Sequence, residues 1–265
     1  MKVPDFTIVC GVDKKHLEQL ELVWPTWKKN KPSLLNHPMV IFYDASDFNR
    51  CRQVCYSDII DHPNLTYTIW PPEHVYYPGD PNDKWTNPQR YKMLAGFVYV
   101  SRLIETPYML KLDTDVVASG FDEWIDPGWF EDEPAIVSHR WNFTKPRDQM
   151  LTLDRWASDC RDNLPEFENT NPLNLKPHPD KDRLGHKRII SWCSFWNVSF
   201  VRMCSSMAGR TCGSYRMPVP SQDGFLWYCA KRLNKGIVRT NMKGRGWQQW
   251  MTMRNIRNHV EGAMR

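Results

Sequence analysis

The chain has 265 residues and a formal net charge of +5, with 41% hydrophobic and 25% charged residues, which is the composition of an ordinary globular protein. This length suits one α/β domain with a single core, or such a domain with a small lobe. No run of about 18 apolar residues occurs, so no membrane-spanning helix is expected. The first residues do not read as a signal peptide, which predicts a soluble, cytoplasmic protein.

Cysteine and tryptophan usage agree with this class. The eight cysteines include no Cys-x-x-Cys pair, and we interpret them as reduced core thiols, with a zinc site on Cys51 and Cys55 as the alternative. Thirteen tryptophans are many for this length. Most are expected to pack in the core, although a few could line a groove for a sugar acceptor.

Strand and helix patterns alternate along the first half of the chain. Gly11 is expected to end the first strand, and Asp13 can cap a helix over residues 14–28. Asp44 directly follows the second strand. Three short apolar segments predict strands: residues 6–10, 39–43 and 65–70.

A buried helix is predicted next, from Pro88 to Glu105. Asn87 and Pro88 provide an N-cap and a first-turn proline, and apolar residues recur on two sides of the helix. Arg90 and Lys92 lie in its first turns, where a positive side chain could reach a phosphate or a sugar. As surface charges they would need no such role.

The segment Tyr108 to Val117, YMLKLDTDVV, is an apolar strand that ends in Asp113-Thr114-Asp115. Because a buried, unpaired carboxylate is costly, two of them at the end of such a strand imply solvent or a counter-cation. Mg²⁺ and Mn²⁺ prefer carboxylate oxygens and leave positions open for phosphate. A surface turn is the alternative, since Asp-Thr-Asp also suits a turn, but the apolar residues on both sides favour a metal site.

The order of these elements predicts an α/β fold. Strands that alternate with helices form an open, mostly parallel sheet flanked by helices, with its site at the carboxyl ends of the strands. Neither Gly-x-Gly-x-x-Gly nor Gly-x-x-x-x-Gly-Lys-Ser/Thr occurs, which weakens an NAD-enzyme and a P-loop interpretation.

The second half of the chain is more irregular. Residues 122–133 are acidic and predict a solvated excursion, and residues 135–139 predict a strand. The polar, proline-rich stretch 140–188 is expected to form loops on the acceptor side, with a helix near residues 148–164. Residues 189–201 predict a strand pair or hairpin.

Further candidate residues lie near the carboxyl terminus. Asp223 precedes an apolar helix over residues 225–233 and is either a general base or an acid that the helix dipole favours. After a strand at residues 236–240 comes Asn241 and a glycine-rich loop that carries Lys243 and Arg245.

The carboxyl-terminal stretch is strongly basic. From Lys231 to Arg265 nine Lys or Arg residues face the single Glu261, a net charge of about +8. This segment could meet a diphosphate, an anionic acceptor, a membrane surface or nucleic acid, or it could be a solvated helix face.

The strand that ends in Asp113-Thr114-Asp115 resembles the Asp-x-Asp motif of GT-A-fold glycosyltransferases, and the order of elements is similar over most of the chain. The resemblance implies a GT-A-like fold and transfer of a sugar from a nucleotide-diphosphate sugar to a hydroxyl of a glycan or another acceptor. It also implies a bound divalent cation, usually Mn²⁺, with Mg²⁺ as the other candidate. Asp115 would then be the principal metal ligand, and Asp113 would face the ribose or the metal.

The same resemblance assigns roles to other residues. The nucleoside would lie across the first strands at Val9, Gly11 and Asp44, and Asp223 would bind the acceptor or act as the base. The segment from Asn241 to Trp247 is similar to the closing segment of glycogenin-type enzymes. These enzymes have a metal-binding His where this chain has Asn241, so Asn241, His259 or water could complete the metal shell.

In this interpretation Lys243 and Arg245 meet the diphosphate, and Gly244 and Gly246 let their loop close over it. Residues 1–265 form one catalytic domain, with a nucleotide-sugar half at 1–118 and an acceptor half with the closing segment at 119–265. The alternatives are a sugar nucleotidyltransferase and a non-catalytic carbohydrate-binding protein.

Overall fold

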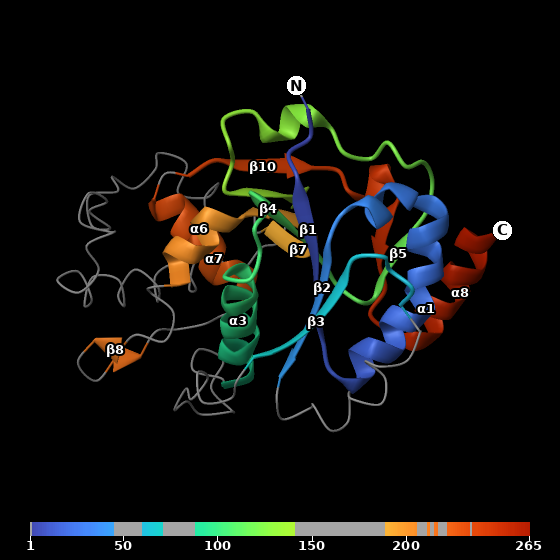
Figure 1. Cartoon of the computed structure of the whole chain (residues 1–265), viewed down its shortest axis with the longest axis horizontal. Helices are drawn as coiled ribbons and strands as arrows, with labels where there is room; N and C mark the ends of the chain where they lie inside the picture. The colour runs from blue at the N-terminus through green and yellow to red at the C-terminus, as the bar shows by residue number, and fades with distance from the viewer. Residues whose placement is uncertain are drawn as a thin grey trace.

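The computed structural model describes residues 2–44, 60–70, 88–140, 189–205, 211–212, 215–216, 222–233 and 235–265. Its centre is a single seven-stranded sheet (Figure 1). In spatial order the strands are β10 (Ile237–Thr240), β6 (Ile136–Arg140), β7 (Ile189–Asn197), β4 (Tyr108–Leu112), β1 (Phe6–Val12), β2 (Met39–Asp44) and β3 (Leu65–Trp70). Only β7 is antiparallel to its neighbours in this sheet. The predicted α/β fold with a mostly parallel sheet is confirmed.

Helices cover both faces of the sheet (Figure 1). One face carries α1 (Lys14–Asn30), α8 (Met253–Met264) and a ribbon of β5 (Val116–Ala118) and β11 (Trp247–Gln249). The other face carries α3 (Pro88–Ser101), α6 (Val198–Ser205) and α7 (Gln222–Arg232). The remaining short elements are η1 (Pro32–Asn36), η4 (Pro127–Phe130), η7 (Lys243–Arg245), β8 (Thr211–Cys212) and β9 (Tyr215–Arg216). In the part of the chain described, no helix has the length and apolar character needed to cross a membrane.

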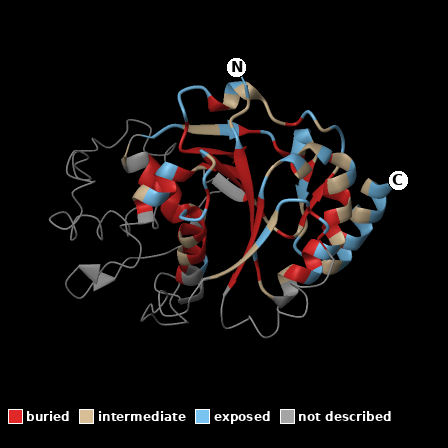
Figure 2. Cartoon of the chain, viewed as in Figure 1, coloured by how far each residue is buried: buried red, intermediate tan, exposed pale blue. Residues whose placement is uncertain are grey.

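The central strands are buried on both faces, as Figure 2 shows. Along β4, Tyr108 and Leu110 belong to the core under α1 and α8, whereas Met109 belongs to the core under α3, α6 and α7. Alternate residues of a strand point to opposite faces, so a strand between two helix layers needs apolar residues at successive positions. This explains the continuous apolar runs in the sequence.

Most tryptophans with described side chains serve the core, as predicted. Among the tryptophans whose side chains the structure describes, seven are buried: Trp24, Trp27, Trp124, Trp192, Trp196, Trp227 and Trp247. The described cysteine side chains are likewise buried free thiols, at Cys10, Cys193, Cys204 and Cys229. Cys51 and Cys55, the alternative zinc pair, lie outside the described residues.

The predicted strand pair over residues 189–201 is wrong. The chain forms one long strand, β7, and then turns directly into helix α6. The side chain of Asn197 accepts a hydrogen bond from the backbone N–H of Phe200 at 3.0 Å, which caps the new helix and ends the strand. Apolar residues continue through the junction because strand and helix are both buried.

The solvated excursion predicted for residues 122–133 is also wrong in part. Trp124 and Phe130 are 1% and 6% exposed, and the Trp124 ring stacks on Phe195 at a centroid distance of 5.7 Å. These two aromatic residues anchor an otherwise polar segment to the sheet. Gly11 lies within β1 and does not end it. The helix predicted near residues 148–164 and most of the acceptor loops predicted for 140–188 lie outside the described residues.

Candidate functional site

The sheet topology brings several predicted residues to one edge. Six strands of the main sheet are parallel, so their carboxyl ends lie at the same edge. Asp44 is the last residue of β2, Asp113 directly follows β4, and Asn241 directly follows β10. This edge is the expected place for a ligand in an open α/β sheet.

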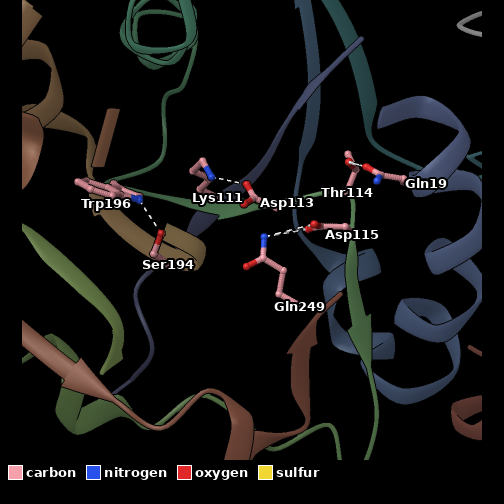
Figure 3. Close-up of polar contacts among 8 residues, drawn as sticks. All are labelled: Gln19, Lys111, Asp113, Thr114, Asp115, Ser194, Trp196 and Gln249. Carbon is pink, nitrogen blue, oxygen red and sulfur yellow. Dashed lines mark hydrogen bonds and ion pairs between the residues drawn. The ribbon is translucent and has the colours of Figure 1, made fainter. Parts of the chain in front are cut away.

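The turn from Asp113 to Asp115 separates its three side chains. Thr114 is 1% exposed and donates from Oγ1 to Oε1 of Gln19 on α1 at 3.1 Å. The backbone N–H of Asp113 donates to the carbonyl oxygen of Trp192 in β7 at 2.8 Å. Thr114 therefore fixes the turn to α1, and the two carboxylates lie away from this anchor (Figure 3).

Asp113 has a cationic partner two residues earlier in the chain, on β4. Lys111 Nζ forms an ion pair with Asp113 Oδ1 (Figure 3), and the two side chains are 13% and 34% exposed. Lys111 lies in β4 and Asp113 is the first residue after it, so the pair is local to the end of this strand. One of the two acids is thus neutralised by the protein.

Asp115 lies in a less favourable environment. Burial and then the Asp113 charge raise the pKa of its carboxyl group to about 6, and the hydrogen bond from Gln249 opposes this shift. Gln249 Nε2 donates to Oδ1 and Oδ2 of Asp115 at 3.2 and 3.3 Å (Figure 3). An amide donor is uncharged, so a cation next to Asp115 would stabilise the carboxylate far more.

The donor set suits a hard divalent cation. Asp113 and Asp115 offer carboxylate oxygens, which Mg²⁺ and Mn²⁺ prefer, and Mg²⁺ commonly binds through one or two carboxylates together with water and phosphate oxygens. Within the described ranges, no three His, Cys, Asp or Glu side chains gather as a metal site. Amide oxygens, water and substrate oxygens are further ligands that suit a cation at this pair.

The residues predicted to bind the nucleoside lie on β1 and β2. Val9 is fully buried in the core, so its predicted contact with a nucleoside stays a prediction. Gly11 is exposed near the end of β1, and a Cβ atom there would lie 2.8 Å from the Phe42 ring. The absence of a Cβ atom at Gly11 therefore leaves room for the Phe42 ring of the neighbouring strand.

Two helices present their amino termini to the same edge. α3 leads through a short connection into the start of β4, and α7 leads in the same way into β10, so both helices run opposite to the parallel strands. The first turns of α3, with Arg90 and Lys92, and of α7, with the half-buried Asp223, therefore lie at the carboxyl edge.

Asn241 caps a turn in this structure. Its Oδ1 accepts a hydrogen bond from the backbone N–H of Gly244 at 3.1 Å. The next backbone N–H, of Met242, donates to His139 Nδ1 at 3.1 Å. Burial and then the Lys243 charge lower the pKa of His139, which favours the neutral ring that this bond needs. The predicted role of Asn241 as a metal ligand stays a prediction.

The glycine-rich loop is compact. Arg245 lies with one guanidinium nitrogen 3.9 Å from Asp126 Oδ2 and with its Cζ atom 5.6 Å from the centroid of the Trp129 ring. Gly246 has a φ of 86°, and a Cβ atom there would lie 1.9 Å from the carbonyl oxygen of Ser119. Close packing against Ser119 thus accounts for this glycine.

Three residues of the site were missed by the sequence interpretation: Gln19, Lys111 and Gln249. Lys111 had a visible signal, because a lysine inside an apolar strand two residues before an acid is unusual. Gln19 and Gln249 have no such signal in the sequence, since each contacts the turn at residues 113–115 only in the folded structure.

A comparison with protein families gives no match, and a comparison with curated protein sequences gives none either. Among solved structures, the chain is similar to core-mannan synthase A from Aspergillus fumigatus in a form with Mn and GDP, with 13% identity, a TM-score of 0.47, and coverage of 86% of this chain and 64% of that protein. The chain is also similar to the galactosyltransferase LgtC in complex with donor and acceptor sugar analogs, with 12% identity and a TM-score of 0.48. This match covers 89% of this chain and 73% of LgtC. The mannosyltransferase Ktr4p from S. cerevisiae has 13% identity to the chain and a TM-score of 0.46. This match covers 85% of this chain and 62% of Ktr4p.

The chain thus spans less than two thirds of the length of the two fungal proteins. Identities of 12–13% and TM-scores below 0.5 assign no activity to it.

Proposed function

We propose that this chain is a metal-dependent glycosyltransferase of the GT-A type, which transfers a sugar from a nucleotide-diphosphate sugar to a hydroxyl group of an acceptor. The observation that carries the proposal is the acid turn at the carboxyl edge of the sheet. Asp113 and Asp115 lie together there, and Thr114 anchors the turn from the opposite side. Asp115 accepts hydrogen bonds from the uncharged Gln249 amide, and burial and the Asp113 charge raise the pKa of its carboxyl group.

Asp113 and Asp115 hold the cation, Mn²⁺ or Mg²⁺, by their carboxylate oxygens. When bound, such a cation supplies Lewis-acid stabilisation to the departing nucleoside diphosphate. Lys111 neutralises Asp113 in the metal-free protein and lies close enough to the site to add positive charge beside the diphosphate.

The donor lies along the carboxyl ends of the first strands in this proposal. Gly11 and Asp44 contact the nucleoside from β1 and β2, with Val9 in the floor beneath it. Arg90 and Lys92, in the first turns of α3, reach a phosphate or the donor sugar, because a cation can pair there with an anionic ligand that also gains from the helix amino terminus.

Lys243 and Arg245 are proposed to approach the diphosphate from η7. Arg245 is 43% exposed, and its partner Asp126 is 48% exposed. Exposed ion pairs of this kind contribute little, about 0–1 kcal/mol, so Arg245 can exchange Asp126 for a phosphate at small cost. Asn241, at the start of the same turn, is a candidate for the third protein ligand of the cation, with His259 or water as the alternatives.

Asp223 is proposed as the acceptor-side acid. It lies in the first turn of α7 at the edge that holds the acid turn. A carboxylate there can accept the proton of an acceptor hydroxyl if the reaction inverts the anomeric centre, or position that hydroxyl if it does not.

Residues 1–118 bind the donor, and residues 119–265 bind the acceptor and include the closing carboxyl-terminal segment, in one catalytic domain whose halves both contribute strands to one sheet. The buried free thiols support a reducing compartment such as the cytosol.

A donor-consumption assay tests the proposal. The purified chain is incubated with UDP-, GDP- and dTDP-sugars, each with Mn²⁺ or with EDTA, and released nucleoside diphosphate is measured. Release from at least one donor with Mn²⁺ and not with EDTA is expected. In a parallel reaction with added pyrophosphate, release of nucleoside triphosphate and sugar 1-phosphate would indicate a nucleotidyltransferase instead. Glycan binding without any donor turnover would indicate a carbohydrate-binding protein.

A further inference from the structure

We infer that Gln249 supplies a third protein oxygen to the cation between Asp113 and Asp115. This inference rests on the proposed function. It places the third protein ligand on β11, whereas the sequence pointed to Asn241 or His259.

Backbone pairing fixes Gln249 beside the acid turn. β11 runs antiparallel to β5, and Gln249 is the register partner of Val116, the residue after Asp115. The next backbone N–H, of Trp250, donates to the carbonyl oxygen of Asp115 at 3.0 Å. The position of the Gln249 side chain is therefore set by strand pairing and does not depend on a mobile loop.

The Gln249 side chain ends at the carboxylate. Its Nε2 lies 3.2 and 3.3 Å from the two Asp115 oxygens, and Figure 3 shows the two side chains pointing toward one another. A primary amide carries an N–H₂ donor and a carbonyl acceptor on the same carbon. A half-turn of this group exchanges Nε2 for Oε1 with little movement of the chain.

Charge decides which end of the amide faces the site. Without a cation, the acceptor-only Asp115 carboxylate selects the N–H₂ end. A divalent cation at the carboxylate repels that end and attracts Oε1, since amide oxygens are ordinary ligands of hard cations. Two carboxylates and one amide form an all-oxygen set, which favours Mg²⁺ or Mn²⁺ over thiolate-seeking metals.

The alternative ligands have other contacts. Asn241 Oδ1 accepts from Gly244 N–H, and a Cβ atom on Gly244 would lie 2.5 Å from Asn241 Nδ2, so this side chain folds over its own turn. His259 stacks on Trp250 with ring centroids 3.5 Å apart and planes 8° from parallel. Of these three residues, Gln249 is the one whose side chain reaches Asp115.

Mn²⁺ binding gives the first test, because free Mn²⁺ has a six-line electron paramagnetic resonance signal that is lost on binding. Mn²⁺ is titrated into the full chain alone, with UDP and with GDP. Gln249→Leu is expected to weaken Mn²⁺ binding by about 10-fold or more, the scale for loss of a group that contacts a metal or its ligand. Gln248→Leu is the matched control, because Gln248 is the exposed neighbour on β11 that pairs with Val117.

A substituted histidine gives the second test and does not depend on the Leu variant folding. In Gln249→His a ring nitrogen replaces the amide oxygen, and pulsed electron paramagnetic resonance of bound Mn²⁺ is expected to show coupling to a directly bound ¹⁴N nucleus. Asn241→His is expected to show none. Coupling in Asn241→His alone would overturn the inference, as would weakened binding in Gln249→Leu without coupling in Gln249→His.

Mn²⁺ binding distinguishes failure of the proposed function from failure of the ligand role of Gln249. If the wild type binds no Mn²⁺ with UDP, with GDP or alone, the proposed function fails. If the wild type binds Mn²⁺ and Gln249→Leu binds it equally well, only the ligand role of Gln249 fails.

Discussion

Asp115 lies in an environment that opposes its own charge. Its pKa is raised to about 6, first by burial and then by Asp113. When folding raises the pKa of a carboxyl group, the ionised group destabilises the folded state at pH values above the folded-state pKa. This destabilisation decreases as the pH falls, and it is absent below the pKa of the unfolded state. This strained charge is what a bound cation would relieve.

Asp115→Asn is therefore expected to stabilise the metal-free protein near pH 8, because the amide keeps the volume and carries no charge. The difference from wild type should shrink as the pH falls from about 7 to about 4, where Asp115 becomes protonated. Thermal unfolding in EDTA at several pH values measures it. A constant difference across this range would contradict the assigned origin of the shift.

Lys111 is the second residue with a clear role in the metal-free protein. Lys111→Met keeps most of the aliphatic stem but leaves Asp113 without this ammonium partner. The metal-free variant should lose about 1–3 kcal/mol, the usual cost of an unsatisfied group in a largely buried site. Mn²⁺ should then raise its melting temperature more than it raises that of the wild type.

Lys111→Arg is the matched control for this change, since it keeps the charge at the same position. It should behave more like the wild type in both measurements. An equal Mn²⁺ effect in wild type and Lys111→Met would show that Lys111 does not compete with the cation.

At the scale of elements, the turn after β10 depends on one glycine. Gly246 has a positive φ of 86° and lies where a Cβ atom would meet the Ser119 carbonyl oxygen at 1.9 Å. Gly246→Ala should destabilise the protein by more than about 1 kcal/mol, because both the backbone conformation and the contact must change. Urea denaturation measures this loss.

Gly262→Ala provides the comparison. Gly262 lies in α8, and a Cβ atom there has no heavy atom within 4 Å, so alanine should be neutral or stabilise by up to about 1 kcal/mol. Equal effects of the two substitutions would contradict a packed turn at residues 243–246.

Local patterns were enough to predict the elements of the first half. The strand before Asp113 is continuous in sequence and buried on both faces, so its apolar run shows directly. Gln249 could not be found in this way. It meets Asp115 across 134 residues of chain, through a β5–β11 pairing of short strands whose own sequences carry little signal.

In the second half of the chain, local sequence patterns also could not predict the position of a whole strand, β7. β7 joins β4 and β6 as the antiparallel strand, and this position depends on which edges of the sheet are free, not on the sequence of β7 itself. Trp124 and Phe130 were likewise hidden among acids, because their burial depends on partners such as Phe195 and Tyr108.

At the scale of the whole molecule, the sheet divides the proposed work between its two halves. The proposed nucleoside and metal residues lie at or just after the ends of β1, β2 and β4, and Lys243 and Arg245 reach the diphosphate from the turn after β10. Asp223 instead lies in the first turn of α7, the helix that packs against β7. A residue on the acceptor side should therefore affect transfer without affecting donor binding.

Asp223→Asn tests this division. Donor binding should survive, and transfer to the acceptor should fall by roughly 10²-fold or more, the scale for loss of an acid-base group. Binding is measured by calorimetry and transfer by product formation. Unchanged transfer would reduce Asp223 to an acid that favours the start of α7.

The most direct test of the account is isothermal titration of UDP and GDP into the wild type and Asp115→Asn, each with Mn²⁺ and with EDTA. The account predicts that the wild type binds at least one nucleoside diphosphate only with Mn²⁺. It also predicts that Asp115→Asn, still folded by circular dichroism, does not bind it under either condition. At a free concentration 100 times its dissociation constant, the bound nucleotide should also add about 2.7 kcal/mol to the free energy of unfolding. Equal Mn²⁺-dependent binding by the two proteins, or no binding by the wild type, would contradict the assignment of the Asp113 and Asp115 pair as a metal and donor site.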